Sequence, residues 1–188
     1  MQLPAGKPPL QNDTQHLSFW ALKLLQSPSK VVCLDTETTG LGSKAQVCEI
    51  AVVNLNREIL LNTFVCPTVP NNATHIHGIS DEQTRNAPLW SEVYTSFCRA
   101  VNDRHVLIYN AAFDRRIIRS TSLAFGLPTP QASSITCAMA KYSDFVGERT
   151  EKGTIKKQKL PFSQTAHNAL SDALAIVDLI YLMAEASL

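Results

Sequence analysis

The sequence predicts an α/β fold in which helices pack on a mixed β-sheet. Short apolar runs with the length of strands recur along the chain, and two of them form a hairpin early in the sequence. The later runs alternate with segments that have the periodicity of helices. Strands that come first, followed by alternating helices and strands, place an antiparallel pair beside parallel strands in one sheet.

The composition fits one domain in a reducing compartment. The chain has 188 residues, of which 45% are hydrophobic, enough for one well-filled core. Its net charge of +1 excludes the long-range attraction of a strongly basic protein for nucleic acid, so any such binding depends on a local site. Five widely spaced cysteines favour free thiols. Because neither a secretory signal nor a membrane-spanning apolar run is evident, we expect a cytoplasmic protein with no membrane partner.

The first half of the chain predicts a leader, a short helix and three strands. Residues 1–29 hold an unstructured leader, up to about residue 15, and a helix that packs on the domain and ends before Pro28. Residues 30–188 form the domain itself. Its first strands are Val31–Leu34, Val47–Asn54 and Glu58–Val65, the last two joined by a turn.

The second half alternates helices and strands. Residues 67–88 have a loop-like composition, and residues 147–159 are polar and charged, which predicts an exposed loop. Asn110 is placed to cap the helix that follows it. The predicted elements are helix Trp90–Val101, strand His105–Tyr109, a helix that ends at Phe125, strand Ile135–Cys137, and helices over Ala138–Phe145 and Ala169–Met183.

Two acidic residues directly follow the first predicted strand. Alternate side chains of a strand point the same way, so Asp35 and Glu37 share a face if the extended geometry continues through them. Two neighbouring carboxylates repel each other, and burial makes the repulsion worse. The pair is therefore either a strand end in solvent or part of a cation site.

Two further acids and a histidine lie where other elements begin. Asp114 falls in the first turn of a predicted helix, where the helix dipole alone explains it, but it also follows a strand end, where sites assemble in α/β sheets. Asp172 borders the apolar side of the last helix, and a carboxylate there needs a partner. His167 can share a site with Asp172 only if it precedes that helix, and an ordinary polar residue is the alternative.

Together, four carboxylates at strand ends and helix starts predict a site for about two divalent cations. Ligation by oxygen atoms favours Mg²⁺ or Mn²⁺. His167 would then take a proton from a water molecule that attacks an electrophile.

The acids lie in three motifs that resemble those of the DEDD 3′–5′ exonucleases of the histidine subclass. This DnaQ-like family is related to the proofreading subunit of bacterial DNA polymerase III, and the resemblance covers residues 30–183. The tyrosine subclass has Tyr four residues before the last acid, where this chain has Asn168, so the histidine subclass is favoured. The motifs are LDTETTGL with Asp35 and Glu37, YNAAFD with Asp114, and HNALSD with His167 and Asp172.

The resemblance implies a ribonuclease-H-like fold with a mixed five-stranded sheet and helices on both faces. It implies metal-dependent release of nucleoside 5′-monophosphates from nucleic-acid 3′ ends, with single-stranded DNA favoured over RNA. Asp35, Glu37, Asp114 and Asp172 would hold two Mg²⁺ or Mn²⁺ ions, and His167 would activate the water. A polymerase partner or a homodimer is compatible with the family. The implied substrate-binding residues are Thr38, Thr39, Gly40, Leu41, His77, Asn110 and Phe113.

Several residues, and the overall function, have two possible interpretations from the sequence. Tyr109 stands where many family members have His, and it either contacts substrate or packs in the protein. Phe113 either stacks on a base or packs in the core, and Glu49 is interpreted as a structural acid. A non-catalytic nucleic-acid-binding or polymerase-docking module on the same fold is the alternative function. A basic cluster either stays solvated or holds substrate phosphates, and it consists of Lys152, Lys156, Lys157 and Lys159.

Overall fold

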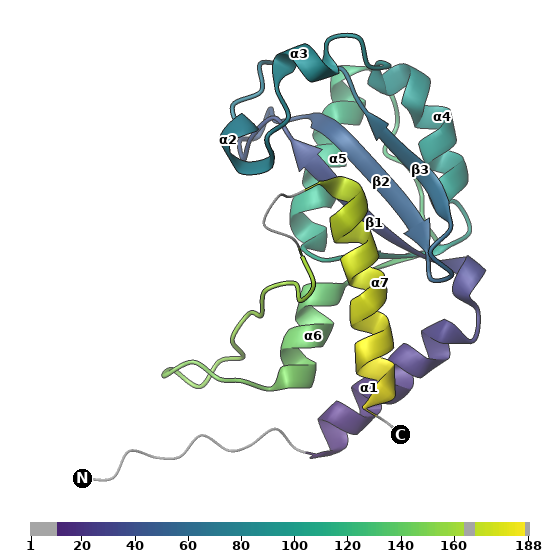
Figure 1. The fold of residues 1–188 in the computed structure, drawn as a ribbon, viewed down its shortest axis with the longest axis vertical. Helices are drawn as coiled ribbons and strands as arrows, with labels where there is room; N and C mark the ends of the chain where they lie inside the picture. The colour runs from purple at the N-terminus through teal and green to yellow at the C-terminus, as the bar shows by residue number, and fades with distance from the viewer. Residues whose placement is uncertain (1–10, 164–167, 187–188) are drawn as a thin grey trace.

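A mixed five-stranded sheet lies between two groups of helices in the computed structural model, which describes residues 11–163 and 168–186 (Figure 1). The strand order across the sheet is β3-β2-β1-β4-β5. The sheet confirms the predicted fold class. Its strands are β1 (Val31–Thr38), β2 (Val47–Asn54), β3 (Ile59–Phe64), β4 (His105–Ile108) and β5 (Ser134–Cys137).

The central strand β1 joins the antiparallel and parallel halves of the sheet. It pairs antiparallel with β2, which pairs antiparallel with β3, and it pairs parallel with β4, which pairs parallel with β5. β1 continues to Thr38, past the predicted end at Leu34, because β2 still runs beside it: Asp35 lies opposite Ala51. The register shifts only after Glu37. The extended geometry therefore continues through both acids, as their predicted shared face requires.

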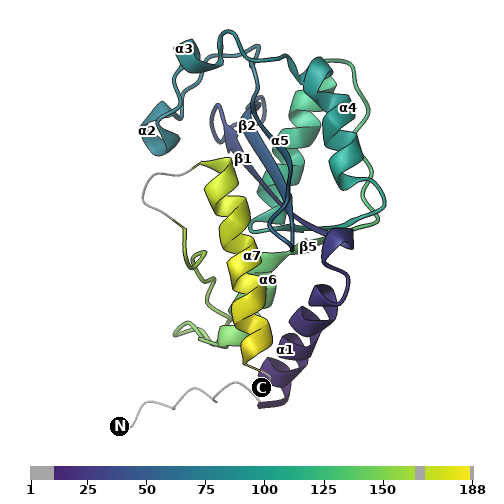
Figure 2. The ribbon, with the colours of Figure 1, turned by 45° about the vertical axis from the view of Figure 1, so that its right-hand side comes forward.

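Helices cover both faces of the sheet, as predicted. In the turned view of Figure 2, α7 and α1 lie on one side of the sheet, and α4 and α5 lie on the other. The first group is α1 (Gln11–Leu25), α6 (Ala138–Val146) and α7 (Ala169–Glu185), and the second is α4 (Trp90–Val101) and α5 (Ala111–Ala124).

Two cores, one on each face, hold these layers together. Alternate residues of β1 serve both, since Val31 and Cys33 pack toward α7 while Val32 and Leu34 pack toward α4 and α5. Every residue of β2 is buried. Such burial on both faces fixes the position and register of the central strands, and hence of the acids that β1 carries.

The N-terminal helix α1 begins earlier than predicted. It starts at Gln11, whereas the sequence predicted an unstructured leader to about residue 15. No proline or glycine interrupts the segment, and Leu17 and Ala21 are buried in the core that α7 shares. The helix thus packs on the domain, as expected, and within its earlier part the hydroxyl of Thr14 donates to the carbonyl of Phe145 in α6, at 3.4 Å.

The segment predicted as a loop between β3 and α4 contains two short helices. They are α2 (Thr74–His77) and α3 (Asp81–Thr84). Ser80 caps α3 by accepting a hydrogen bond from the amide of Gln83, whose side chain accepts from the amide of Ser80. Four residues are too few to show helical periodicity, so only this capping pattern could have revealed α3.

The later elements lie where the sequence predicts them, with one correction. Asn110 occupies the N-cap position of α5, but its side chain makes no capping hydrogen bond; instead its carbonyl accepts from the amide of Phe113, at 2.8 Å. The residues of the loop 147–159 are mostly exposed, as expected. Across the described part of the chain, no helix combines the length and apolar character needed to cross a bilayer.

Candidate active site

Three of the predicted metal ligands meet at the end of β1. Single carboxylate oxygens of Asp35, Glu37 and Asp172 all lie within 4.8 Å of one another. Glu37 and Asp172 are each 8% exposed. β1 contributes the first two and the first turn of α7 contributes the third, so the cluster forms only when β1 and α7 pack together.

Hydrogen bonds fix the start of α7 and thereby Asp172. The side chain of Asn168 accepts from the amide of Ser171, at 2.8 Å, which caps the helix. The amide of Ala169 donates to Oε2 of Glu49 on β2, at 2.9 Å. The hydroxyl of Ser163 donates to Oδ1 of Asp172, at 2.6 Å. Glu49 is therefore structural, as interpreted from the sequence, and it ties the sheet to the helix that carries the third acid.

Asp114 approaches the cluster from the other helical layer. It lies in the first turn of α5 and is 4% exposed. Thr36, between the two acids of β1, donates its hydroxyl to Oδ1 of Asp114 at 2.8 Å. The charge of Asp114 acts on Asp35, where it raises the pKa of that carboxyl. β1 therefore connects the three-carboxylate cluster to the fourth acid through its own alternating side chains.

The electrostatics of this site favour a bound cation. Burial raises the pKa of Asp35 well above its usual range, and the charges of Asp114, Asp172, Glu37 and Glu49 raise it further. Burial also raises the pKa of Asp114 to about 6, although the hydrogen bond from Thr36 opposes the rise. Carboxylates held this close are stabilised by protons or by a cation, and an all-oxygen donor set suits Mg²⁺ or Mn²⁺. The residues present therefore fit divalent cations.

His167, the predicted general base, lies outside the described residues. α7 begins at Ala169, so His167 precedes the helix, which was the condition for its sharing a site with Asp172. The described residues on either side of segment 164–167 are Ser163, which bonds Asp172, and Asn168, which caps α7.

The last residue of β1, Thr38, leads into a short loop, residues 39–42, next to the acids in the sequence. The hydroxyl of Thr38 donates to the carbonyl of Gly40 at 3.0 Å, and the hydroxyl of Thr39 accepts from the amide of Gln46 at 3.0 Å. Gly40 has a φ of +153°, which side chains rarely adopt, so its glycine is explained by backbone conformation. Leu41 is 72% exposed. The loop lines a cavity of about 280 Å³ together with residues of the β3–α2 connection.

His77 braces this loop. Its Nδ1 accepts from the amide of Ile79, at 3.1 Å, so its Nε2 carries the proton and donates to the carbonyl of Thr38, at 3.1 Å. The bond to Thr38 ties His77 to the backbone at the end of β1, and the bond from Ile79 ties it to the residue that follows Gly78. They hold α2 against the predicted substrate pocket.

Arg116 is a site residue that the sequence did not reveal. Its guanidinium lies over the half-buried ring of Phe113, 5.2 Å from the ring centroid. It also donates to the carbonyls of Leu41 and Gly42, at 3.2 and 2.9 Å. An arginine on an exposed helix face gives no sequence signal, because the contact joins segments far apart in the chain.

The hydroxyl of Tyr109 contacts the backbone of another segment of the protein. Its hydroxyl donates to the carbonyl of Gln158 at 2.9 Å, which fastens the basic loop to the end of β4. The four lysines of that loop are all exposed, and Lys156 forms an ion pair with Glu148 at 2.7 Å. Packing is therefore the interpretation of Tyr109 that its contacts support.

The sequence of the chain is similar to an exonuclease and to DNA polymerase III epsilon subunits. Residues 32–180 match the family described as Exonuclease. The chain is 34% identical over 166 residues to the uncharacterized exonuclease CP81 of Escherichia phage 186, covering 78% of this chain and 86% of that protein. It is 32% identical over 102 residues to the DNA polymerase III subunit epsilon of Pasteurella multocida, covering 48% of this chain and only 40% of that protein.

Solved structures of exonucleases share the fold. Exonuclease X in complex with 5′ overhanging duplex DNA matches with a TM-score of 0.61 and 23% identity, over 84% of this chain and 92% of that one. E. coli Exonuclease I in complex with a dA16 oligonucleotide matches with a TM-score of 0.62 and 16% identity, over 79% of this chain and 39% of that one. From its sequence match, its acidic motifs and its ribonuclease-H-like sheet, the chain belongs to the exonuclease family as a DnaQ-like member and is a nuclease.

Proposed function

We propose that the chain is a metal-dependent 3′–5′ exonuclease that releases nucleoside 5′-monophosphates from nucleic-acid 3′ ends. One observation carries this proposal: Asp35 and Glu37 of β1 meet Asp172 of α7, with ligand atoms within 4.8 Å. Asp114 adds a fourth carboxylate whose charge reaches Asp35. Hydrolysis of a phosphodiester, whose own charge is negative, requires compensating positive charge at such an acidic site.

The four carboxylates of Asp35, Glu37, Asp114 and Asp172 would hold two Mg²⁺ or Mn²⁺ ions. The raised pKa of Asp35 supports this assignment, because a cation would stabilise the ionised form that burial and neighbouring acids oppose. Bound there, the cations would supply the positive charge that stabilises the attacking and leaving oxygens of an in-line displacement.

His167 would act as the general base. Its ring would accept the proton of the attacking water, a role that suits a side chain with an unperturbed pKa near 6.5. Two described contacts support the assignment, since Ser163 and Asn168 flank the segment and both contact the first turn of α7. Segment 164–167, which contains His167 in the sequence, connects Ser163 and Asn168, and both of these residues contact the first turn of α7.

The loop after β1 would bind the terminal nucleotide. Thr38, Thr39 and Gly40 would shape the pocket, and the exposed side chain of Leu41 could wedge against a base. His77 would support that loop from α2, because it bonds the carbonyl of Thr38. Asn110 and Phe113, at the start of α5, would line its other side. The exposed lysines of residues 152–159 would contact phosphates upstream of the scissile bond, which predicts salt-dependent binding.

The proposed function also includes a substrate and possible protein partners. We propose a free 3′ end as the substrate, with single-stranded DNA favoured over RNA. The relatives named DNA polymerase III subunit epsilon support a polymerase partner, although this chain spans less than half the length of the Pasteurella protein. A homodimer is the second assembly to be tested.

A degradation panel tests the activity. The purified chain is incubated with single- and double-stranded DNA and RNA, labelled at the 3′ or the 5′ end, with Mg²⁺, with Mn²⁺ or with a chelator. We expect a 3′ label to be released first, as a nucleoside 5′-monophosphate identified by mass, and only with a divalent cation. A substrate labelled at the 5′ end should instead keep its label and give a ladder of products shortened from the 3′ end.

Two variants test the assigned roles. Asp35→Asn and His167→Ala should each lower the rate by about 10²-fold or more, the contribution expected of a positioned general base or metal ligand. Asp144→Asn, an exposed acid of α6, is the matched control and should leave the rate unchanged. Unchanged turnover in both site variants would refute the mechanism. Calorimetry adds a second test, because a non-catalytic docking module should show no divalent-cation binding that depends on Asp172.

A further inference from the structure

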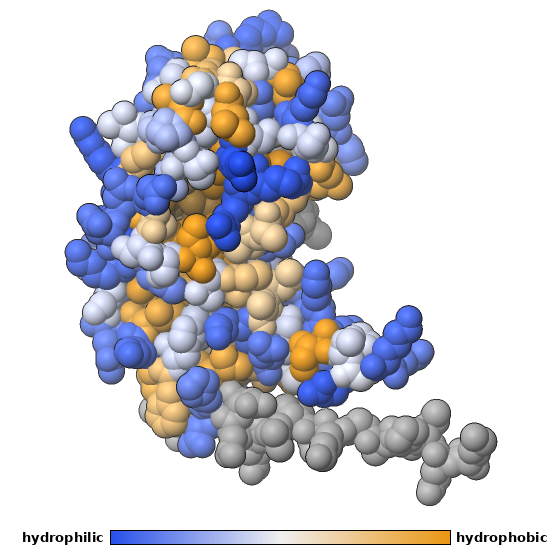
Figure 3. Space-filling model, turned by 180° about the vertical axis from the view of Figure 1, so that it is seen from behind, coloured by the Kyte–Doolittle hydropathy of each residue, from blue (hydrophilic) through white to orange (hydrophobic). Residues whose placement is uncertain are grey.

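A second cavity lies on the face of the sheet that α4 and α5 cover. Its volume is about 510 Å³, within the range of ligand sites in proteins. Figure 3, which views the molecule from this side, shows apolar atoms in a hollow bordered by hydrophilic ones. The floor is formed by apolar side chains of β1, α4, β4 and α5, namely Leu34, Phe97, Val101, Val106, Ile108 and Ile118.

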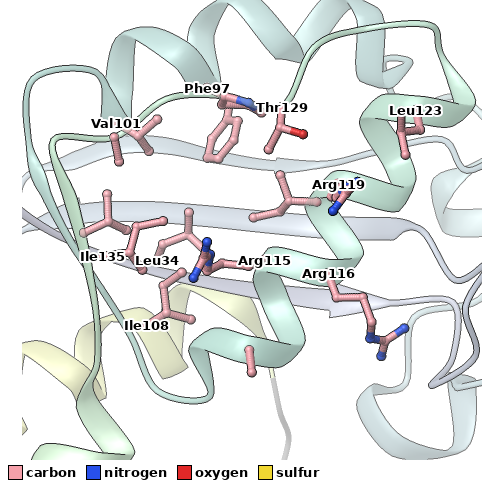
Figure 4. Close-up of a pocket in the computed structure, with 15 residues that line it drawn as sticks. Leu34, Phe97, Val101, Ile108, Arg115, Arg116, Arg119, Leu123, Thr129 and Ile135 are labelled. Carbon is pink, nitrogen blue, oxygen red and sulfur yellow. The ribbon is translucent and has the colours of Figure 1, made fainter.

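All the charge around this cavity is positive and comes from α5. Arg115, Arg116 and Arg119 line it, and none of the other lining residues is charged. Figure 4 shows Arg115 reaching from α5 toward the floor, while Arg116 points away, toward its contacts with the loop after β1. Among residues 11–163 and 168–186, neither Arg115 nor Arg119 forms an ion pair. Two exposed guanidinium groups are therefore available to a negatively charged ligand.

The cavity is separate from the acidic cluster although it uses the same helix. At about 100° per residue, Arg119 lies about 140° around α5 from Asp114, so the two point to different sides of the helix. Asp114 bonds Thr36 at the end of β1. A ligand bound against Arg115 and Arg119 would thus leave the carboxylates accessible.

The apolar floor argues against nucleic acid as the occupant. A strand of nucleic acid binds through phosphates on basic side chains and through bases stacked on aromatic faces. Phe97 is the one aromatic residue that lines the cavity, so the lining offers no platform on which successive bases could stack. Aliphatic side chains make up most of the floor, and they favour aliphatic or aromatic side chains of a ligand.

Two of the apolar residues that line the cavity are themselves exposed to solvent. Leu123, in the last turn of α5, is 64% exposed, and Ile135, on the edge strand β5, is 38% exposed. Both line the cavity. The apolar area therefore extends over its mouth, farther than a small anion would cover, and a peptide segment fits it better.

We propose that this cavity, which we call the α4–α5 cavity, binds an acidic segment of a partner protein. Large apolar side chains of the segment pack against the apolar lining, above all against the exposed Leu123 and Ile135, and its Asp or Glu carboxylates pair with Arg115 and Arg119. Charge complementarity selects the acidic partner, because arginine forms bidentate hydrogen bonds with carboxylates. The proposal does not depend on the proposed exonuclease activity, since it uses none of the carboxylates.

Selection from a display library of random peptides tests the chemistry directly. The full chain is immobilised, and peptides that also bind the double variant Arg115→Glu/Arg119→Glu are removed. We expect the remaining peptides to combine acidic residues with Leu, Ile, Phe or Trp. A selection that yields no such peptides, or yields basic or purely polar ones, overturns the proposal.

The affinity of one enriched peptide, labelled with fluorescein, is then measured by fluorescence anisotropy. We expect at least about a tenfold weaker Kd for the double variant and for Leu123→Ser, and weaker binding at high salt. Arg99→Glu is the matched control: Arg99 is exposed on α4 but does not line the cavity, so its Kd should be unchanged. Circular dichroism and thermal melting confirm folding, and Arg119→Glu alone replaces the double variant if that variant is unfolded.

A labelled single-stranded oligonucleotide in a chelator separates the two classes of macromolecule. If the double variant weakens oligonucleotide binding tenfold and peptide binding not at all, the arginines serve nucleic acid and the proposal is overturned. Equal peptide affinity in wild type and all cavity variants also overturns it.

Discussion

Removal of the charge of Asp114 should stabilise the protein at neutral pH when no divalent cation is present. The carboxyl group is 4% exposed, and burial raises its pKa from 3.8 to about 6. A carboxyl group with a higher pKa in the folded chain binds more protons when folded. Its contribution to stability is present at low pH and is lost as the pH rises from about 4 through about 6.

The size of this loss follows from the two pKa values. At about 1.4 kcal/mol per pKa unit, a change from 3.8 to about 6 corresponds to about 3 kcal/mol of unfolding free energy. Asn in place of Asp114 has no proton to lose, and its amide oxygen can still accept the hydrogen bond from Thr36. Relative to wild type, Asp114→Asn should therefore gain about 3 kcal/mol between about pH 4 and about pH 7, or about 6–12 °C in Tm for a chain of this size.

Urea unfolding followed by tryptophan fluorescence measures the effect, since Trp90 is fully buried. The titrations are run with a chelator across this pH range and repeated with Mg²⁺ or Mn²⁺. The cation should stabilise the wild type more than the variant. Asp144→Asn, which removes an exposed acid, is the control and should follow the wild-type pH profile. If Asp114→Asn and wild type lose the same free energy across this range, the argument from burial is wrong.

Two further changes test contacts that support the site. Arg116→Ala should raise KM several-fold with a smaller change in kcat, because the substitution removes the donors to the Leu41 and Gly42 carbonyls that hold the loop after β1. Steady-state kinetics measure both constants, and an unchanged KM would contradict a role of Arg116 in holding the loop. Glu49→Ala should lower the unfolding free energy by about 1–3 kcal/mol, because the buried amide of Ala169 loses its hydrogen-bond acceptor. Glu49→Gln keeps an acceptor oxygen, so it should retain most of the stability. Urea titration measures both variants.

Local sequence patterns predicted the parts of the fold that depend on neighbouring residues. The apolar run before Asp35 identified a buried strand, and alternation placed Asp35 and Glu37 on one face. The start of α7 followed from the apolar pattern after Asn168. Periodicity is sufficient in these cases because burial on one or both faces imposes it.

Contacts between distant segments were not predictable in the same way. Glu49 bonds an amide 120 residues away, and Arg116 bonds a loop 74 residues before it. Nothing next to either residue indicates its partner. For Asn110, the sequence predicted a local contact that the structure lacks. Its residue type suits a helix cap, but its backbone conformation leaves the side chain without a capping hydrogen bond. Which polar group meets which depends on the packing of whole layers.

The order of the elements along the chain determines when the site can exist during synthesis. β1 emerges from the ribosome early with Asp35 and Glu37, whereas Asp172 belongs to α7, which follows all the other described elements. A nascent chain that has made its whole sheet still lacks one of the four acids and the helix that positions it. Any cleavage by the nascent chain that depends on the complete cluster is therefore withheld until α7 has left the ribosome.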